Sequence, residues 1–233
     1  MDISLLSLNV YLAVIPSVIL LVYVYQKDIV EKEPLRLLVT LFFLGILVAV
    51  PIMFLEQNAI SFTGINLINY FDSFALSFFI VSLIEEGYKF IVILIASWKN
   101  KNFNHKYDAI VYSVFVSLGF ATIENILYVI RNDYKVALYR AVISVPAHAF
   151  YAITCGYFLG LAKESSIKKN KKKKILFLLL SFIIPWILHG IFDFLLLTEN
   201  AILLGVFFSF VALLYVISYV QIHKTYNGKL LKK

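Results

Sequence analysis

The sequence predicts an all-α fold, a polytopic membrane bundle of about seven transmembrane helices, on three observations. First, 61% of the 233 residues are hydrophobic and the mean hydropathy is +0.88, which is more apolar surface than a soluble core of this size could bury. Second, apolar windows long enough to span a bilayer recur along the chain. Third, Lys and Arg gather in alternate connections between these windows. Together these features predict a single transmembrane domain over residues 1–233.

The helices are predicted from runs of about 20 apolar residues, the length that crosses the hydrocarbon core of a bilayer. The windows are 4–26, 35–55, 74–97, 108–131, 136–162, 175–197 and 201–223. The first follows Asp2 without a basic segment or a small-residue cleavage site, so we expect a retained helix and not a removed signal peptide. The third carries the charged stretch EEGYK at its centre. The fifth and sixth contain Pro146 and Pro185, and each proline opens the helical ladder beside a histidine.

The charges of the connections predict an orientation. Seventeen Lys and Arg residues fall on one side of the predicted bundle, against only Arg131, Lys135 and Arg140 on the other. By the positive-inside rule, the N-terminus is expected outside the cell and the C-terminus inside. The run KKNKKKK at 168–174 is accordingly predicted to be a topology anchor that faces anionic lipid, and not a site for nucleic acid.

Ionisable side chains lie inside four of the predicted helices. At a helix centre each charge costs roughly 2.5–3.5 kcal/mol, so several in one small bundle are expected to pair or to take part in chemistry. Glu85 and Lys89 are four residues apart, as are His189 and Asp193, so each pair shares a helix face. Counting about 1.5 Å per residue from the outer helix ends places Glu85, Glu124, His148 and His189 at a common depth of roughly 10–18 Å. One polar cavity is therefore predicted, lined by Glu85, Glu86, Lys89, Glu124, His148, His189 and Asp193.

Three glutamates, two histidines and an aspartate around water suit hydrolysis. A desolvated glutamate can take a proton from water, and a positioned general base contributes about 10²–10⁴ in rate. The histidines could hold a tetrahedral oxyanion, with Asp193 fixing the tautomer of a neighbouring imidazole. Zn²⁺ offers a second route, because Glu and His are ordinary ligands of this metal; the expected ligands are then Glu86, Glu124, His148 and His189. Both routes stay open, whereas the HExxH, GxSG and GxGD signatures of other intramembrane proteases are absent.

Two other interpretations compete with an enzyme. Glu85 and Lys89 could be an ion pair that only holds the bundle together. A proton- or cation-coupled transporter could use the same buried groups as a relay, although a conduit needs polar residues at several depths and these crowd into one. Outside this group, Asn125 is expected to bond a neighbouring helix, and His105 is expected to be solvated in a basic loop.

Four motifs, in this order, closely resemble the PrsW family of intramembrane proteases over roughly residues 70–197. They are EEGYK at 85–89, DAIVYSVFVSLGFATIENILY at 108–128, HAFYAITCG at 148–156 and HGIFDF at 189–194. The family is distantly similar to the CAAX-processing prenyl proteases, which are also glutamate-dependent enzymes of the membrane. One departure is that Ser113 and Ser117 stand where glycines are expected in the second motif.

The resemblance implies a multi-pass peptidase of the bacterial cytoplasmic membrane, with its catalytic motifs within residues 82–194. It implies site-1 cleavage of a single-span anti-sigma factor near the extracytoplasmic face, as the first step of a stress response. Catalytic roles carry over to Glu85 and Glu86. Places in the site carry over to Glu124, to His148 and His189, and to Asp193, which closes the last motif.

Overall fold

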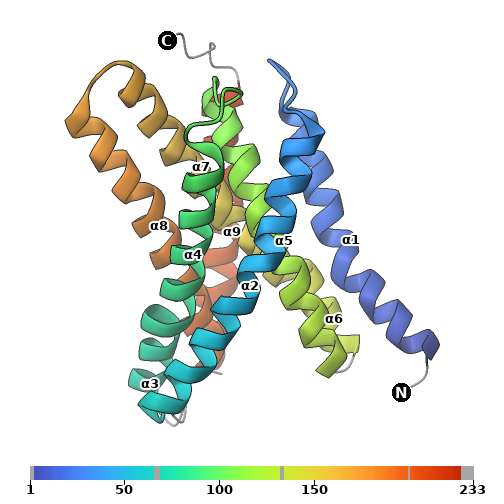
Figure 1. The fold of residues 1–233 in the computed structure, drawn as a ribbon. Coiled ribbons are helices and arrows are strands. Elements are labelled where there is room, and N and C mark those ends of the chain that lie inside the picture. Colours follow the sequence, from blue (N-terminus) through green and yellow to red (C-terminus); the bar gives the residue numbers. More distant parts are fainter. Residues whose placement is uncertain (1–2, 66–68, 132–133, 199, 227–233) are drawn as a thin grey trace.

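The computed structural model describes residues 3–65, 69–131, 134–198 and 200–226, and every regular element in them is helical (Figure 1). Two short π-helical segments, η1 (Leu76–Val81) and η2 (Arg140–Ser144), interrupt the α-helices. The α-helices are α1 (Ile3–Lys27), α2 (Leu35–Thr63), α3 (Tyr70–Ala75), α4 (Ser82–Ser97), α5 (Lys106–Arg131), α6 (Tyr134–Tyr139), α7 (Val145–Ile167), α8 (Lys171–Leu197) and α9 (Ala201–Tyr226).

The predicted all-α membrane bundle is confirmed. In the described residues, six helices are long and apolar enough to cross a membrane, and they match six of the predicted windows. The remaining window, 74–97, is divided between the end of α3, η1 and α4, and α4 by itself is 16 residues long and carries three charges. Helix α2 is longer than predicted because it runs to Thr63, where Gly64 ends it in the left-handed conformation with φ 65°. This extension brings Glu56 inside the helix.

The two π-helical segments lie directly before residues of the predicted site. A π-turn inserts one residue into a helix and so rotates the faces on either side of it, and such turns occur mostly at functional sites. Segment η1 ends four residues before Glu85, and η2 ends two residues before Pro146. Pro146 stands at the start of α7, where its missing N–H costs little, whereas Pro185 lies inside α8.

Helices α5 and α7 pack closely because small residues line their contact. A Cβ added to Gly156 would overlap the α5 backbone at Ala109 and Ile110, and one added to Gly160 would overlap Lys106. Close approach through small residues is the usual basis of helix association in membranes. On the other side of α5, the Asn125 amide donates to the carbonyl of Ala13 in α1 at 3.1 Å, as expected. Helix α5 is thereby fixed at the centre of the bundle.

The lysine-rich connections all lie at one end of the bundle (Figure 1). The connections α1–α2, α4–α5 and α7–α8 and the end of α9 share this end, and the last turns of α2, α5 and α8 lie at the other. The charge separation agrees with the alternation that the sequence predicts, while the inside and outside assignment stays a prediction. Lys229, Lys232 and Lys233, which were counted in the larger set, lie outside the described residues.

The prediction of a solvated His105 is wrong. Its side chain is 1% exposed, and its Nδ1 accepts from the backbone N–H of Tyr107 at 3.2 Å. The reason is the start of α5: Asp108 Oδ2 accepts from the backbone N–H groups of Asn104 and His105, at 2.9 and 2.6 Å, and folds the preceding loop inward.

Glu33, in the connection between α1 and α2, gives a test of this end of the fold. Burial raises the pKa of Glu33 from 4.5 to about 7. The Tyr112 hydroxyl lowers this pKa in part, and the nearby Asp28 and Glu31 carboxylates raise it further. Asp108 on α5 is a third carboxylate that faces Glu33. The folded protein thus keeps a proton that the unfolded chain has lost, so stability present below pH 4.5 is lost as the pH rises through about 7. We expect Glu33→Gln to remove this slope when melting temperatures are compared at about pH 5 and about pH 8. The exposed Glu31→Gln removes only the smallest contribution to the shift and should keep most of the slope, whereas an unchanged slope in Glu33→Gln would contradict the assignment.

Candidate active site

Helix α4 supplies a buried cluster of three charges. Lys89 Nζ lies 3.0 Å from Glu85 Oε2 and 2.5 Å from Glu86 Oε1, and all three residues are at most 6% exposed. The spacings of three and four residues bring both carboxylates to the same ammonium group. Lys89 also lies 4.6 Å from the ring centroid of Phe120 on α5. The expected Glu85 and Lys89 pair is therefore present, but as one side of a cluster of three.

Helix α8 meets this cluster through His189. Its Nδ1 lies 3.0 Å from Glu86 Oε1, and its Nε2 lies 3.3 Å from Asp193 Oδ2. Tyr151 of α7 stacks on the imidazole with a centroid distance of 4.7 Å. With a carboxylate at each nitrogen and a ring against its face, the imidazole is held in one orientation. This is the geometry expected of Asp193 as the orienting residue.

A second cluster joins α5 and α7. His148 Nε2 lies 3.1 Å from Glu124 Oε2, and Arg140 Nη2 lies 2.8 Å from the same oxygen. Arg140 Nε donates to Asn125 Oδ1 at 2.9 Å, and the guanidinium lies 3.9 Å from the ring centroid of Tyr128. The two clusters touch, because the His148 and His189 rings lie 5.5 Å apart. All seven predicted site residues are thus brought together.

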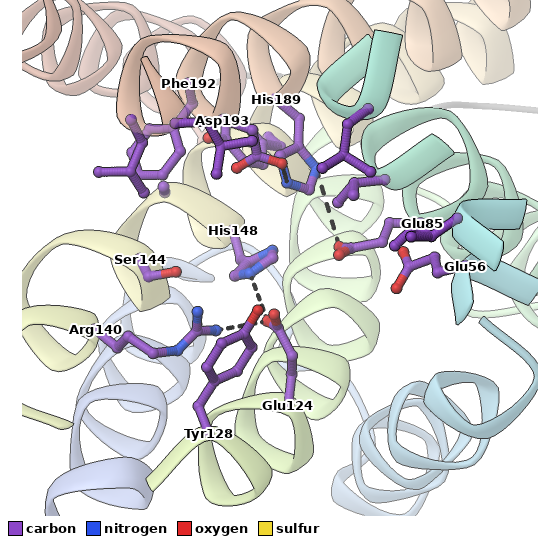
Figure 2. A pocket seen from close by; sticks show the side chains of 17 residues that line it. Glu56, Glu85, Glu124, Tyr128, Arg140, Ser144, His148, His189, Phe192 and Asp193 are labelled. Atoms are coloured by element: carbon purple, nitrogen blue, oxygen red, sulfur yellow. Dashed lines mark hydrogen bonds and ion pairs between the residues drawn. The ribbon is translucent and has the colours of Figure 1, made fainter. Parts of the chain in front are cut away.

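Arg140 corrects the sequence analysis, which counted it among the connection charges. It lies in η2, and its side chain extends toward the Glu124 carboxylate in the site (Figure 2). The signal for it was its position inside the apolar window 136–162, where an arginine is costly without a partner. Glu56 was missed for another reason, since the predicted window ended one residue before it.

The two clusters surround a cavity of about 300 Å³, into which the labelled side chains of Figure 2 point. A second cavity of about 350 Å³ is lined by residues of α2, α4 and α5. Glu56, Glu85, Glu124 and Tyr128 line both, whereas Glu86 lines neither. Glu56 Oε1 is buried and has no hydrogen-bond partner within the described residues. The site is therefore polar, enclosed by helices and large enough for water and a peptide group.

A metal ion fits one group of side chains in the site. Within the described part of the chain, ligand atoms of Glu85, Glu86 and His148 lie within 4.8 Å of one another, and His148 Nδ1 is buried without a partner. Because Glu124 engages Nε2, the other nitrogen is left to act as a ligand, which is the common carboxylate and histidine arrangement of zinc sites. This group shares Glu86 and His148 with the predicted ligands. It contains Glu85 in place of Glu124 and His189, whose polar atoms already bond to neighbours.

Ser117, one of the two serines at expected glycine positions, supports the site. Its hydroxyl donates to the backbone carbonyl of His148 at 3.1 Å and so links α5 to α7 beside the imidazole. Ser113 is fully buried one turn earlier on α5. The departure from the motif therefore adds a contact and leaves the clusters intact.

A multi-pass helical bundle that buries paired carboxylates, histidines and a metal-capable group in a polar cavity defines the class of intramembrane metalloenzymes. The family model described as "PrsW family intramembrane metalloprotease" matches residues 33–222, and the chain belongs to this family. The resemblance of the four motifs is thereby confirmed.

Three relatives show how far the similarity extends. Protease PrsW of Clostridioides difficile (strain 630) is 37% identical over 220 residues, which cover 93% of this chain and 90% of that one. Protease PrsW of Oceanobacillus iheyensis is 44% identical over 181 residues, covering 78% and 79%. Protease PrsW of Bacillus subtilis (strain 168) is 38% identical over 181 residues, with the same coverage. No solved structure matches the chain.

Arg140 allows a test of the second cluster. Arg140→Gln leaves the Glu124 carboxylate without its cation, so we expect a loss of about 1–3 kcal/mol in the free energy of unfolding. Adding Glu124→Gln should recover most of that loss, because the unpaired charge is gone. Thermal melting in detergent measures the cycle, with Lys101→Gln at the far end as control. Equal destabilisation in the single and double variants would show that the two groups are not coupled.

Proposed function

We propose that this protein is a peptidase of the bacterial cytoplasmic membrane that makes the first cut in a single-span anti-sigma factor during a stress response. Membership of the PrsW family supports intramembrane proteolysis, and the motif resemblance supports the substrate class. The observation that carries the proposal is a polar cavity within the bundle onto which Glu85 opens beside the unpartnered Nδ1 of His148. These findings favour a protease over a proton- or cation-coupled transporter.

The surroundings of the two adjacent glutamates give them different roles. Glu85 lines both cavities, so its carboxylate meets water. Glu86 lines neither, and its Oε1 is occupied by Lys89 and His189. We therefore assign Glu85 as the general base and Glu86 as the residue that positions Lys89 and His189.

Hydrolysis then proceeds through groups of the chain. Glu85 takes a proton from water, the water oxygen bonds to the scissile carbonyl carbon, and the C–N bond breaks as Glu85 returns that proton to the leaving amine. His189 Nδ1, 4.0 Å from Glu85 Oε2, and Lys89 balance the charge of the carboxylate between these steps. Glu124, held by Arg140, keeps the His148 ring oriented toward the cavity.

Glu85, Glu86 and His148 would hold a metal ion, which when bound would polarise the scissile carbonyl and acidify a water molecule. Glu124 would then be the carboxylate behind the ligating histidine, the position that fixes the ring tautomer in such sites.

A transmembrane substrate must unwind before it can be cut, because a helix hides its carbonyls, and unwound backbone is tolerated at membrane depth only in a protein-lined, wet cavity. The second cavity provides an approach. Its rim is formed by Gln57 and Ile60 of α2, which are exposed, and by Leu127 of α5. We propose that the substrate segment enters between α2 and α5 and reaches Glu85 from that side.

The roles of the two glutamates are tested by single substitutions in purified protein with a single-span anti-sigma factor as substrate. Glu85→Gln should lower cleavage by about 10²–10⁴ without changing the melting temperature, since it removes the base and keeps a hydrogen-bonding side chain. Glu86→Gln should lower both cleavage and melting temperature, because Lys89 and His189 lose a shared partner. Full activity of Glu85→Gln would refute the base, and full activity of both variants would refute the site.

The metal group is tested by metal content and by chelation. Wild-type protein is expected to retain zinc through purification, and His148→Ala to lose it while keeping its fold. A chelator should stop cleavage, and added Zn²⁺ should restore it. Unchanged cleavage and no bound zinc would remove the metal from the proposal and leave the assignment of Glu85 standing.

A further inference from the structure

A groove between the ends of α4 and α8, at the lysine-rich end of the bundle, is not used by the proposed reaction. It has a volume of about 410 Å³. Its lining combines three apolar side chains, one tryptophan and two lysines: Leu94, Ile95, Trp98, Lys99, Lys174 and Leu178.

The apolar wall of the groove faces outward to lipid. Ile95 is 81% exposed, and Leu94 and Leu178 are partly exposed beside it. These residues lie within the last turns of α4 and the first turns of α8, so the wall runs along the membrane-facing surface. An extended hydrocarbon chain is the ligand that fits such a wall best, because it covers apolar surface with apolar surface.

The end of the groove toward the connections is cationic and aromatic. Lys174 Nζ lies 5.4 Å from the ring centroid of Trp98, and Lys99 follows Trp98 directly. Among the residues that the structure describes, no carboxylate lies within 4.0 Å of either ammonium group. Trp98 is held in place, because Lys163 Nζ donates to its carbonyl at 2.7 Å. Tryptophan and lysine at a helix end are typical of the headgroup level of a membrane.

We propose that Trp98, Lys99 and Lys174, with the wall formed by Leu94, Ile95 and Leu178, bind one anionic phospholipid. The two lysines would contact the headgroup phosphate, and the wall would take the first part of an acyl chain. Both parts of the lipid have a counterpart in the groove. A soluble anion would leave the apolar wall uncovered, and a neutral lipid would leave the two lysines without an anionic partner. Basic pockets between transmembrane helices are a recurrent form of lipid recognition.

The position of the groove links the lipid to the site. The groove joins α4, which carries Glu86, to α8, which carries His189, and lies about 20 Å along α4 from Glu86 at about 1.5 Å per residue. Between the two places the helices are joined by the stacked rings of Phe90 and Phe182, whose centroids lie 5.9 Å apart. A lipid that bridges the helix ends would stabilise this pairing and the His189 contact that it supports.

The test uses the full chain in detergent, depleted of lipid, with phosphatidylglycerol, phosphatidylcholine or inorganic phosphate added. Native mass spectrometry counts retained lipid, and thermal melting reports stability. Wild-type protein should retain one phosphatidylglycerol and melt at a higher temperature with it, and should show neither effect with phosphatidylcholine or phosphate. Lys99→Gln with Lys174→Gln should weaken retention about 30-fold, equal to about 2 kcal/mol at 1.4 kcal/mol per tenfold.

The matched control is Lys171→Gln with Lys172→Gln, two exposed lysines in the first turn of α8 that do not line the groove. It removes the same charge and should leave retention unchanged. Equal loss in both double variants would show attraction to net charge and overturn the site, and an effect of phosphate alone would show an anion site without lipid. Leu178→Trp should block the wall while keeping both lysines, and undiminished retention would contradict the acyl contact. Measuring Glu85→Gln in parallel separates lipid binding from catalysis.

Discussion

The site depends on one buried cation, the ammonium group of Lys89 between Glu85 and Glu86. Two adjacent carboxylates inside a membrane bundle would be too costly to keep without it, because water does not solvate them and each would repel the other. One lysine cannot neutralise two carboxylates, and His189 of α8 provides a further contact to Glu86. The α4 and α8 packing is therefore tied to the same charges that the reaction uses, which explains why a motif on one helix is matched by a motif on the other.

A second set of paired charged groups, which joins α5 to the start of α7, makes the cavity stable as well as polar. Glu124 is compensated by Arg140, and His148 lies between this pair and the first cluster. Each carboxylate of the two clusters lies against at least one lysine, arginine or imidazole nitrogen, so none of them stands isolated in the wall of the cavity. Among the described residues that line this cavity, Glu56 Oε1, His148 Nδ1 and the Tyr151 hydroxyl are buried atoms without a partner. Unsatisfied atoms are costly, and their place beside Glu85 is where a substrate or metal would satisfy them.

The parts of the site that follow from local geometry could be predicted from the sequence. Lys89 contacts both glutamates because residues three and four apart share a helix face. The four helices that carry the site pack together because buried charges are costly unless they pair, and these charges lie at one depth. Arg140 was misplaced because it was counted with the connection charges, although its position inside the apolar window 136–162 makes an arginine without a partner costly. Glu56 was missed because the hydropathy window ended before the helix did. The metal group differed from the predicted one because ligand choice depends on which nitrogen of each imidazole is already bonded.

The separation of Glu85 from Glu86 shows how much function rests on helix rotation. Neighbours on an α-helix point about 100° apart, so a single rotation of α4 decides which carboxylate meets the cavity and which meets Lys89 and His189. Segment η1 sets this rotation, because its wider turn shifts the register of α4 relative to the residues before it, and Ser82 Oγ holds the junction by donating to the carbonyl of Ser77 at 2.6 Å. The same sequence as an unbroken α-helix would turn a different face of α4 toward His148. The π-helical turn before EEGYK thus helps to place Glu85, and not Glu86, at the cavity where we propose that it acts as the base.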